Sequence, residues 1–304
     1  MLSVAGATLR RTRNSFAYRS SGFCKLILAH WLPPRVVSKP AIRITYLTYA
    51  GGAYLPMLRE SVASLANAWN RLPRLRVVSD GTLEPDRLRS ELGFWPSPVE
   101  AFDWREFVPE ARARGYGSLV RFADRVPMAR KMLAVIASAF HGPTMYADVD
   151  VLWFRMPRLL SSGGAMDKPR ILMSEDFQAT YDSNLVPSVL PHLAEPPFYC
   201  AGILFANDDF LADCEMSNLF DYAAIHGDSV TEQTLLAEAA HQRGAEVLGS
   251  SEFALTDADR FILGPSFLGK PWAARHYIGQ VRHLFWRDAL ALRIGVGSGM
   301  SSGR

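Results

Sequence analysis

The sequence of 304 residues predicts an α/β fold, with a mainly parallel central sheet that carries helices on both faces. Three observations predict this fold class. Segments with strand and helix patterns alternate along the chain, the best strand segment is apolar enough to be buried, and 49% of the residues are hydrophobic. That composition is sufficient for one large domain, or two small ones, with a substantial core.

The first strand, helix and strand follow one another from Ala41. Residues 42–49 are rich in β-branched and aromatic side chains and stop at a Gly-Gly pair, which predicts a strand that ends in a turn. Apolar residues in 55–69 recur at three- and four-residue steps, as in an amphipathic helix, and residues 75–79 predict a second strand. Because parallel neighbours need a crossover connection, which a helix usually supplies, this order predicts a βαβ unit.

The alternation continues towards the end of the chain. Residues 96–117 are aromatic, charged and irregular, which predicts a long loop with short helical pieces, whereas residues 144–154 predict a buried strand that emerges at an edge. No GxGxxG pattern follows the first strand, which argues against a dinucleotide cofactor. We further expect helices at 127–140, 210–225 and 231–242, and strands at 170–174, 199–206 and 246–248.

The first forty residues differ from the rest in composition. They contain no carboxylate and seven basic residues, namely Arg10, Arg11, Arg13, Arg19, Lys25, Arg35 and Lys39. We expect residues 1–40 to be a disordered or poorly docked extension, with a transit peptide or a mis-assigned translation start as the alternatives. A single folded domain is predicted over residues 41–294, followed by a flexible tail at 295–304.

Charge and cysteine content limit the partners and the compartment. The formal charge is +3, and the chain beyond the first forty residues has no basic stripe, which argues against a nucleic-acid partner. No apolar run approaches the roughly 20 residues that cross a bilayer, so we expect no transmembrane segment. Three cysteines without a CxxC pair fit a reducing compartment. We therefore expect a cytoplasmic protein, with peripheral attachment at a membrane as the second localisation.

Two aspartates, Asp148 and Asp150, are candidate metal ligands. On an extended backbone, alternate side chains point to the same face, so both carboxylates can share one cation. Their hard oxygen ligands suit magnesium or manganese. Two solvated aspartates at a strand end are the plain alternative, but the flanking segment from Tyr146 to Trp153 is mostly apolar, where unpaired carboxylates are costly.

The run Met-Tyr-Ala-Asp148-Val-Asp150-Val-Leu resembles the metal motif of the GT-A glycosyltransferases. It is most similar to the retaining family that includes glycogenin and the bacterial lipopolysaccharide galactosyltransferases. The resemblance implies a GT-A catalytic domain over residues 41–294, a Mn²⁺ or Mg²⁺ cofactor on the two aspartates, and a nucleotide-sugar donor, either a UDP- or a GDP-sugar. It also implies an acceptor that is a saccharide, a lipid or a protein.

Two further matches concern the donor. Lys131, seventeen residues before Asp148, matches the basic residue that the family places on the preceding helix to reach the donor, although an exposed lysine and a role for Arg130 instead are the alternatives. Residues 199–204 resemble the Asn-Ala-Gly strand that lines the sugar pocket in the family, with Cys200 in place of asparagine. Gly202 lacks a side chain and so lets backbone approach a ligand, and we expect Cys200 to be a small buried hydrophobe.

The pair Glu232-Gln233 resembles an Asp-Gln pair that opens a helix in the family and faces the anomeric carbon and the acceptor. The resemblance makes both residues catalytic candidates, and Thr231 is the expected N-cap of the helix. An acidic residue that interacts favourably with the helix dipole is the plain alternative.

The segment from His276 to Arg282 resembles the carboxy-terminal signature of the family. In that signature a histidine completes the metal shell, and a basic residue six positions later binds the diphosphate, with Gly279 between them. Arg282 stands where lysine is more usual, and its guanidinium can bind phosphate in a bidentate manner. A structural histidine is the plain alternative for His276.

Tyr46, Thr48 and Tyr49 are expected near the nucleotide base, since open α/β sheets place ligands at the ends of strands. Three alternatives stay open. Glu232 could act as a covalent nucleophile. A sugar-phosphate nucleotidyltransferase also uses carboxylate-bound metal on a sheet, but the basic, glycine-rich loop typical of that class is missing after the first strand. The altered positions Cys200 and Glu232 also motivate a non-catalytic binding module with the same fold.

Overall fold

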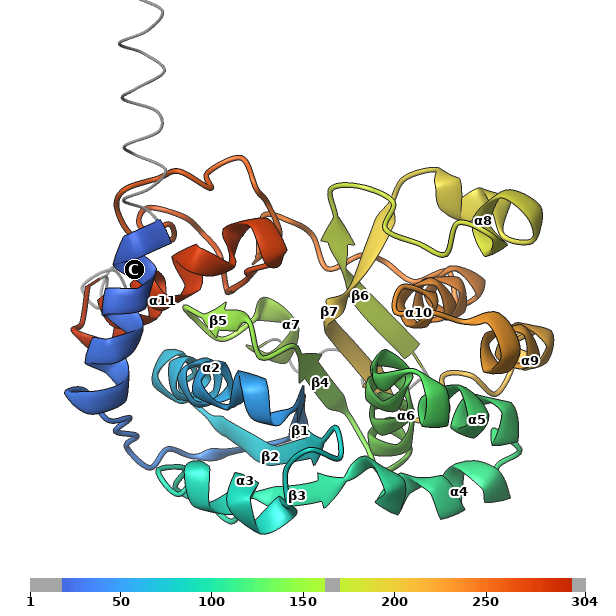
Figure 1. The fold of residues 1–304 in the computed structure, drawn as a ribbon, viewed down its shortest axis with the longest axis horizontal. Coiled ribbons are helices and arrows are strands. Elements are labelled where there is room, and N and C mark those ends of the chain that lie inside the picture. Colours follow the sequence, from blue (N-terminus) through green and yellow to red (C-terminus); the bar gives the residue numbers. More distant parts are fainter. Residues whose placement is uncertain (1–17, 162–169, 297–304) are drawn as a thin grey trace, which may run out of the picture.

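The computed structural model describes residues 18–161 and 170–296, which fold around a six-stranded sheet (Figure 1). Its strands are Ala41–Ala50 (β1), Leu72–Ser79 (β2), Glu100–Asp103 (β3), Thr144–Ala147 (β4), Arg170–Asp176 (β6) and Phe198–Asn207 (β7). The order is β3-β2-β1-β4-β7-β6, with the first four strands parallel and β7 antiparallel to both its neighbours. The predicted α/β class with a mainly parallel sheet is confirmed.

Helices cover both faces of the sheet, and each face has its own core (Figure 1). One group of helices is Gly117–Arg125 (α5), Pro127–Phe140 (α6), Ser217–His226 (α9) and Thr231–Gln242 (α10), and the other is Leu55–Ala68 (α2), Pro85–Glu91 (α3) and Arg282–Arg293 (α11). Because successive strand side chains point to opposite faces, Leu47 packs with the first group and Tyr46 with the second.

A second, three-stranded sheet lies beside α2 and α11. Its strands, in spatial order, are Val151–Trp153 (β5), Ala274–His276 (β9) and Phe253–Ala254 (β8). The short helices are Gly52–Tyr54 (η1), Trp104–Phe107 (η2), Val108–Ala113 (α4), Arg158–Ser161 (α7), Leu185–Ser188 (α8), Pro191–Ala194 (η3) and Gly279–Val281 (η4).

The carboxyl ends of β1 and β4 lie side by side where the strand order reverses. From β1 the chain continues outward through β2 and β3, whereas β4 lies on the other side of β1. Open α/β sheets bind ligands at such a switch point, outside the carboxyl ends of the strands. Asp148 is the first residue after β4 and therefore lies at this point.

Most of the predicted elements are present, and four differ. The expected loop at 96–117 contains the edge strand β3, the helix expected from residue 210 begins only at Ser217, and the strand expected at 246–248 is a single bridge from Leu248 to Ser174. The predicted strand 144–154 is interrupted, because residues 148–150 form a turn between β4 and β5.

The expectation of disorder over residues 1–40 is wrong for the part that is described. Residues 18–30 are helical and pack beside α11 (Figure 1). Cys24 and Leu28 lie four positions apart, so they share a helical face, and both are buried. Residues 1–17, and residues 297–304 of the predicted tail, lie outside the described ranges. Over those ranges, no helix has the length and apolar character needed to cross a membrane.

Candidate metal and donor site

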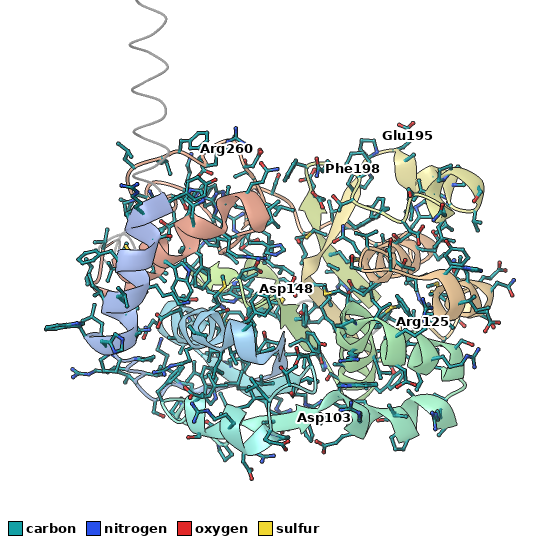
Figure 2. The ribbon with its side chains drawn as sticks, viewed as in Figure 1. Asp103, Arg125, Asp148, Glu195, Phe198 and Arg260 are labelled. Atoms are coloured by element: carbon teal, nitrogen blue, oxygen red, sulfur yellow. The ribbon has the colours of Figure 1, made fainter. Side chains whose placement is uncertain are left out.

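Asp148 and Asp150 lie on the turn that joins β4 to β5. Figure 2 shows Asp148 near the centre of the molecule. The amide of Asp148 donates to the carbonyl of Gly202 in β7 (2.8 Å), and the amide of Val151 donates back to the carbonyl of Asp148 (3.1 Å). These bonds close a tight turn. The two carboxylates therefore come together because the backbone turns, and not, as we expected, because they alternate on an extended strand.

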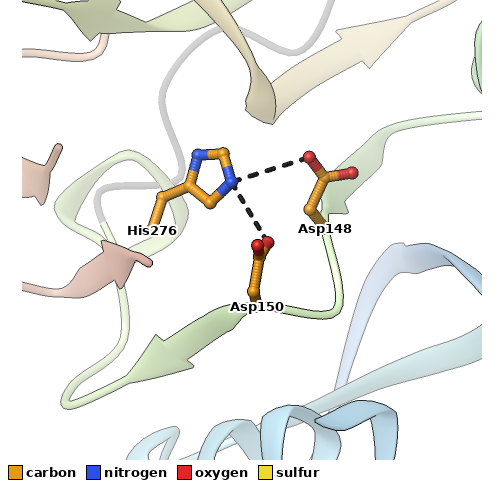
Figure 3. Close-up of side chains that lie close together, drawn as sticks. All are labelled: Asp148, Asp150 and His276. Carbon is orange, nitrogen blue, oxygen red and sulfur yellow. Dashed lines mark ion pairs between the residues drawn. The ribbon is translucent and has the colours of Figure 1, made fainter. Parts of the chain in front are cut away.

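His276 reaches the two aspartates from the second sheet. It pairs with Val151 across β5 and β9, and the amide of Tyr277 donates to the carbonyl of Asp150 (2.8 Å). The His276 Nε2 atom lies 3.1 Å from Asp150 Oδ1 and 3.7 Å from Asp148 Oδ2 (Figure 3). One ligand atom from each of the three residues lies within 4.8 Å of the others. Two carboxylates and an imidazole in this arrangement fit a divalent cation such as Mn²⁺ or Mg²⁺.

The protonation of this cluster is set by its ion pairs. Burial alone would raise the pKa of Asp150, but the charges of His276 and Arg282 outweigh it and hold that pKa below its ordinary value. Burial would likewise lower the pKa of His276, but Asp150 and Cys200 raise it well above the ordinary value. His276 is therefore protonated when no metal is bound, and it must lose that proton to become a metal ligand.

Gly202 and Cys200 surround the His276 ring. A Cβ atom on Gly202 would lie 2.1 Å from Cε1 and 2.3 Å from Nδ1 of His276. The glycine thus makes room for an imidazole of the protein itself, and this differs from our expectation that it admits a ligand. Cys200 is buried, as predicted, but its Sγ also lies 3.5 Å from Nδ1, so it has a polar contact as well.

Lys131 points into the site from α6. Its Nζ atom lies 3.8 Å from Asp148 Oδ1 and 3.2 Å from Glu232 Oε1, and the hydroxyl of Tyr146 donates to the same Asp148 oxygen. Burial would lower the pKa of Lys131, but the two carboxylates outweigh it and raise the pKa. Lys131 is therefore a buried cation and not an exposed helix lysine.

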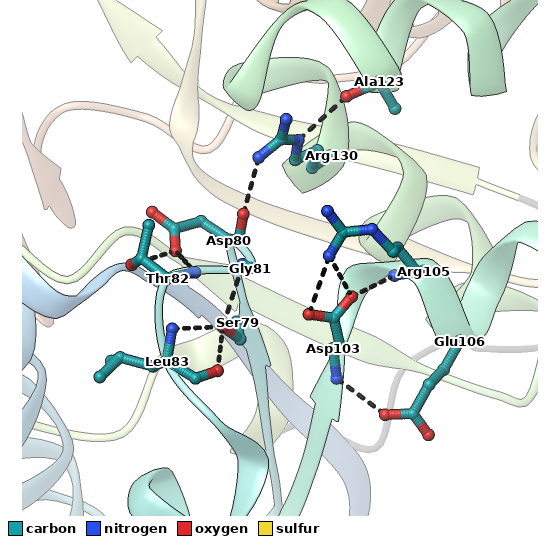
Figure 4. A network of polar contacts seen from close by, with 10 residues as sticks. All are labelled: Ser79, Asp80, Gly81, Thr82, Leu83, Asp103, Arg105, Glu106, Ala123 and Arg130. Carbon is teal, nitrogen blue, oxygen red and sulfur yellow. Dashed lines mark hydrogen bonds and ion pairs between the residues drawn. The ribbon is translucent and has the colours of Figure 1, made fainter.

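Arg130, the alternative to Lys131, points elsewhere (Figure 4). Its Nε donates to the carbonyl of Ala123 (3.0 Å) and its Nη1 to the carbonyl of Asp80 (2.7 Å). Arg130 therefore ties α5 to the loop after β2.

Glu232 and Gln233 open α10, and both are occupied within the protein. Glu232 is 1% exposed and faces Lys131, and burial raises its pKa to about 7 against the opposing charge of Lys131. The Gln233 side chain accepts from the amide of Ala201 (3.1 Å) and donates to the carbonyl of Thr180 (3.0 Å). The predicted contact of this pair with sugar or acceptor stays a prediction.

The predicted N-cap of α10 is wrong. Thr231 is already helical, and Asp228 accepts from the amides of Val230 (2.9 Å) and Thr231 (3.2 Å). The Thr231 hydroxyl instead donates to Asp182 (2.6 Å), which joins α10 to the segment after β6.

Arg282 and Gly279 approach the site from the start of α11. The Nη2 and Nε atoms of Arg282 lie 2.7 and 3.2 Å from Asp150 Oδ2. A Cβ on Gly279 would have no atom within 4 Å, so that glycine borders open space. Tyr54, which we did not predict, is exposed, and its ring centroid lies 5.9 Å from the guanidinium carbon of Arg282.

The β1 residues expected near the base are largely enclosed. Tyr46 is fully buried and accepts from Trp153 Nε1 (3.1 Å), which removes it from any ligand surface. Thr48 is buried, and the hydroxyl of the half-buried Tyr49 donates to the carbonyl of Pro127 (2.9 Å). A contact of Thr48 or Tyr49 with a base stays a prediction.

Asp176 is a second residue that we did not single out. It ends β6, whose carboxyl end lies at the same sheet edge as that of β4, since both strands are antiparallel to β7. Burial raises its pKa, and the charge of His276 opposes that shift. The sequence could have indicated Asp176 as a candidate site residue, because it is an acidic residue at the end of an apolar strand, as Asp148 is.

No protein-family model matches this chain, and neither does any curated protein by sequence. The structure is similar to that of mouse xyloside xylosyltransferase 1, and the match covers 77% of this chain and 97% of the xylosyltransferase chain, with a TM-score of 0.51 at 13% identity. This chain has the GT-A fold. The match to the galactosyltransferase LgtC, solved with donor and acceptor sugar analogues, covers 77% of this chain and 87% of the LgtC chain, with a TM-score of 0.47 at 16% identity. The match to the bifunctional glycosyltransferase WbbM covers 85% of this chain and 50% of the WbbM chain, with a TM-score of 0.49 at 11% identity. The match to the xylosyltransferase structure confirms the GT-A fold implied by the sequence motifs.

Proposed function

We propose that this protein is a retaining glycosyltransferase that moves a sugar from a nucleoside-diphosphate-sugar donor, a UDP- or GDP-sugar, to a saccharide, lipid or protein acceptor. The observation that carries the proposal is the meeting of Asp148, Asp150 and His276 at the switch point of a GT-A sheet. The names of the similar structures, a xylosyltransferase and a galactosyltransferase, support sugar transfer.

In this proposal the three residues hold Mn²⁺ or Mg²⁺, which neutralises charge on the departing diphosphate when bound. Arg282 leaves Asp150 and binds a phosphate oxygen, which a guanidinium does well. Lys131 supplies a second, fixed positive charge beside Asp148. Preorganised cations of this kind stabilise developing negative charge without rearrangement, and this electrostatic term supplies most of the rate.

Glu232 and Gln233 are positioning residues in this mechanism. Glu232 pairs with the Nζ of Lys131, which also lies near Asp148, and Gln233 fixes the β7 backbone next to Gly202. The enclosed carboxylate of Glu232 argues against the covalent nucleophile that the sequence left open. Asp176 and Tyr54 border the same region and are candidates for sugar and nucleotide contacts respectively.

The test is donor hydrolysis across UDP- and GDP-sugars with Mn²⁺ present, on wild-type protein and Asp150→Asn. We expect hydrolysis of one donor, lower by about 100-fold or more in the variant, and a product sugar whose anomeric configuration, measured by NMR, is that of the donor. Asp86→Asn is the matched control, because that carboxylate is exposed on α3. Equal hydrolysis by Asp150→Asn would reject the metal assignment, and no metal-dependent nucleotide binding in calorimetry would favour the binding module.

A further inference from the structure

The N-terminal helix and the segment after it expose an unusual number of large apolar side chains. Over the described ranges, five of the thirteen exposed large hydrophobic residues lie between Tyr18 and Val37. Phe23 is 66% exposed, Leu26 58%, Trp31 79% and Val37 76%. Single exposed hydrophobic residues are ordinary, but a cluster in twenty residues marks an interaction surface.

This helix is apolar on two faces. Cys24 and Leu28 face the body of the protein and are buried, whereas Phe23 and Leu26 project from the other side. A helix in contact with a domain on one side and water on the other normally carries polar residues on its outer face. The exposed apolar side chains on the outer face therefore indicate that this face contacts a second apolar surface.

Hydrogen bonds attach the segment after the helix to the body of the protein. Lys39 Nζ donates to the carbonyls of Ala66 (2.7 Å) and Trp69 (2.6 Å) at the end of α2, and Arg293 Nη1 donates to the carbonyl of Leu32 (3.3 Å). A partner bound here would hold the GT-A domain in a fixed orientation.

The positive charge of this region indicates which kind of partner it binds. Arg19 and Arg35 are exposed near the two ends of the apolar surface, and the first acidic residue in the whole sequence is Glu60. In a two-fold dimer through this surface, each basic patch would face its own copy with no carboxylate from residues 1–59 to pair with it. An anionic bilayer instead offers negative headgroups to the cations and an interface that favours Trp and Phe.

We propose that residues 18–37 dock this protein on the surface of an anionic lipid bilayer, with Phe23, Leu26 and Trp31 inserted among the headgroups. The docking does not depend on the proposed transferase activity. Arg19 and Arg35 contribute the attraction to anionic lipid, which falls as salt rises.

The test uses the full chain with vesicles of phosphatidylcholine alone or of equimolar phosphatidylcholine and phosphatidylglycerol. We expect binding to the anionic vesicles, reduced about tenfold or more by Phe23→Ser with Leu26→Ser, and about fivefold for each of Arg19→Gln and Arg35→Gln. Ile225→Ser is the matched control, because Ile225 is 67% exposed on α9.

Trp31 reports where binding occurs, because it is 79% exposed whereas Trp69, Trp95, Trp104 and Trp153 are buried. Trp272 and Trp286 are half-buried, so the variant Trp31→Phe separates the signal of Trp31 from theirs. Brominated lipid is expected to quench the emission of Trp31 on binding, and Trp31→Phe to remove most of that quenching. Equal binding to both vesicle types, full binding by the Phe23/Leu26 variant, or binding without quenching would overturn the proposal. So would light scattering that shows a dimer abolished by the same two substitutions.

Discussion

Gly202→Ala is the change for which the geometry gives the clearest expectation. The added Cβ would lie 2.1 Å from Cε1 of His276, and ordinary carbon contacts begin near 3.5 Å. The ring must therefore move by about 1.4 Å, or β7 must shift by a similar amount. Metal-ligand distances tolerate only about 0.2 Å. His276 is then lost as a ligand.

Because changes outside the ligand set already cost about 10- to 100-fold in metal affinity, we expect Gly202→Ala to weaken Mn²⁺ binding by about 100-fold or more. Calorimetric titration of the purified protein with Mn²⁺ measures this directly. Gly264→Ala is the control, because a Cβ there meets no atom within 4 Å. Circular dichroism of both variants shows whether the sheet is intact.

The double variant separates this effect from a general disturbance of β7. His276→Ala removes the ring, so the Cβ at position 202 then has space. The double variant Gly202→Ala/His276→Ala is therefore expected to have nearly the same metal affinity and free energy of unfolding as His276→Ala alone. The effects of the two substitutions would then be strongly non-additive. Additive losses, or wild-type Mn²⁺ affinity in the Gly202→Ala single variant, would refute the reasoning.

Three further predictions concern the neighbours of the metal site. Because burial raises the pKa of Glu232 from 4.5 to about 7, wild-type stability is expected to fall as pH rises from 4.5 to 7, by about 3 kcal/mol relative to Glu232→Gln; parallel pH profiles in urea unfolding would contradict this. Arg282→Gln is expected to leave Mn²⁺ affinity without nucleotide equal or a few-fold higher, since Arg282 competes for Asp150, while affinity for the donor's nucleotide, UDP or GDP, with Mn²⁺ drops about tenfold; calorimetry showing weaker metal binding alone would oppose it. Cys200→Val removes the polar contact with His276 and is expected to weaken Mn²⁺ binding by about 10- to 100-fold. Cys200→Ser keeps a polar atom beside His276 and is expected to retain the Mn²⁺ affinity; equal affinities for the two variants would count against a positioning role for Cys200.

The sequence was sufficient for the elements with strong local patterns. The glycine turn after β1, the apolar spacing of α2 and the segment that became α6 each predicted the correct element, because helix and strand periodicities are local properties. The edge strand β3 has only four residues, Glu-Ala-Phe-Asp, and its pairing with β2 depends on a neighbour distant in the chain. The N-terminal helix was missed because a short basic segment gains its stability from packing on α11.

The candidate site was predicted as a set of residues, but not as a geometry. Family resemblance brought together Asp148 and His276, which are 128 positions apart, and the structure brings them together by pairing β5, which follows the acidic turn, with β9, which ends at His276. Whether the acids alternate on a strand or lie on a turn is decided by where β4 stops pairing with β7. Likewise, alternation along β1 assigns Tyr46 and Leu47 to different faces, but only the packed helices show that Tyr46 is enclosed.

The charges of the site explain why metal and nucleotide depend on each other. Three basic residues face three acidic ones, namely Lys131, His276 and Arg282 against Asp148, Asp150 and Glu232. A cation arriving alone has to displace a proton and a guanidinium that already neutralise the aspartates. A diphosphate gives that guanidinium a new partner and so frees Asp150 for the cation. When cation and diphosphate bind together, the breaking of the Asp150–Arg282 ion pair is compensated, because Asp150 gains the cation and Arg282 gains the diphosphate. Binding of either ligand therefore favours binding of the other, which is positive coupling.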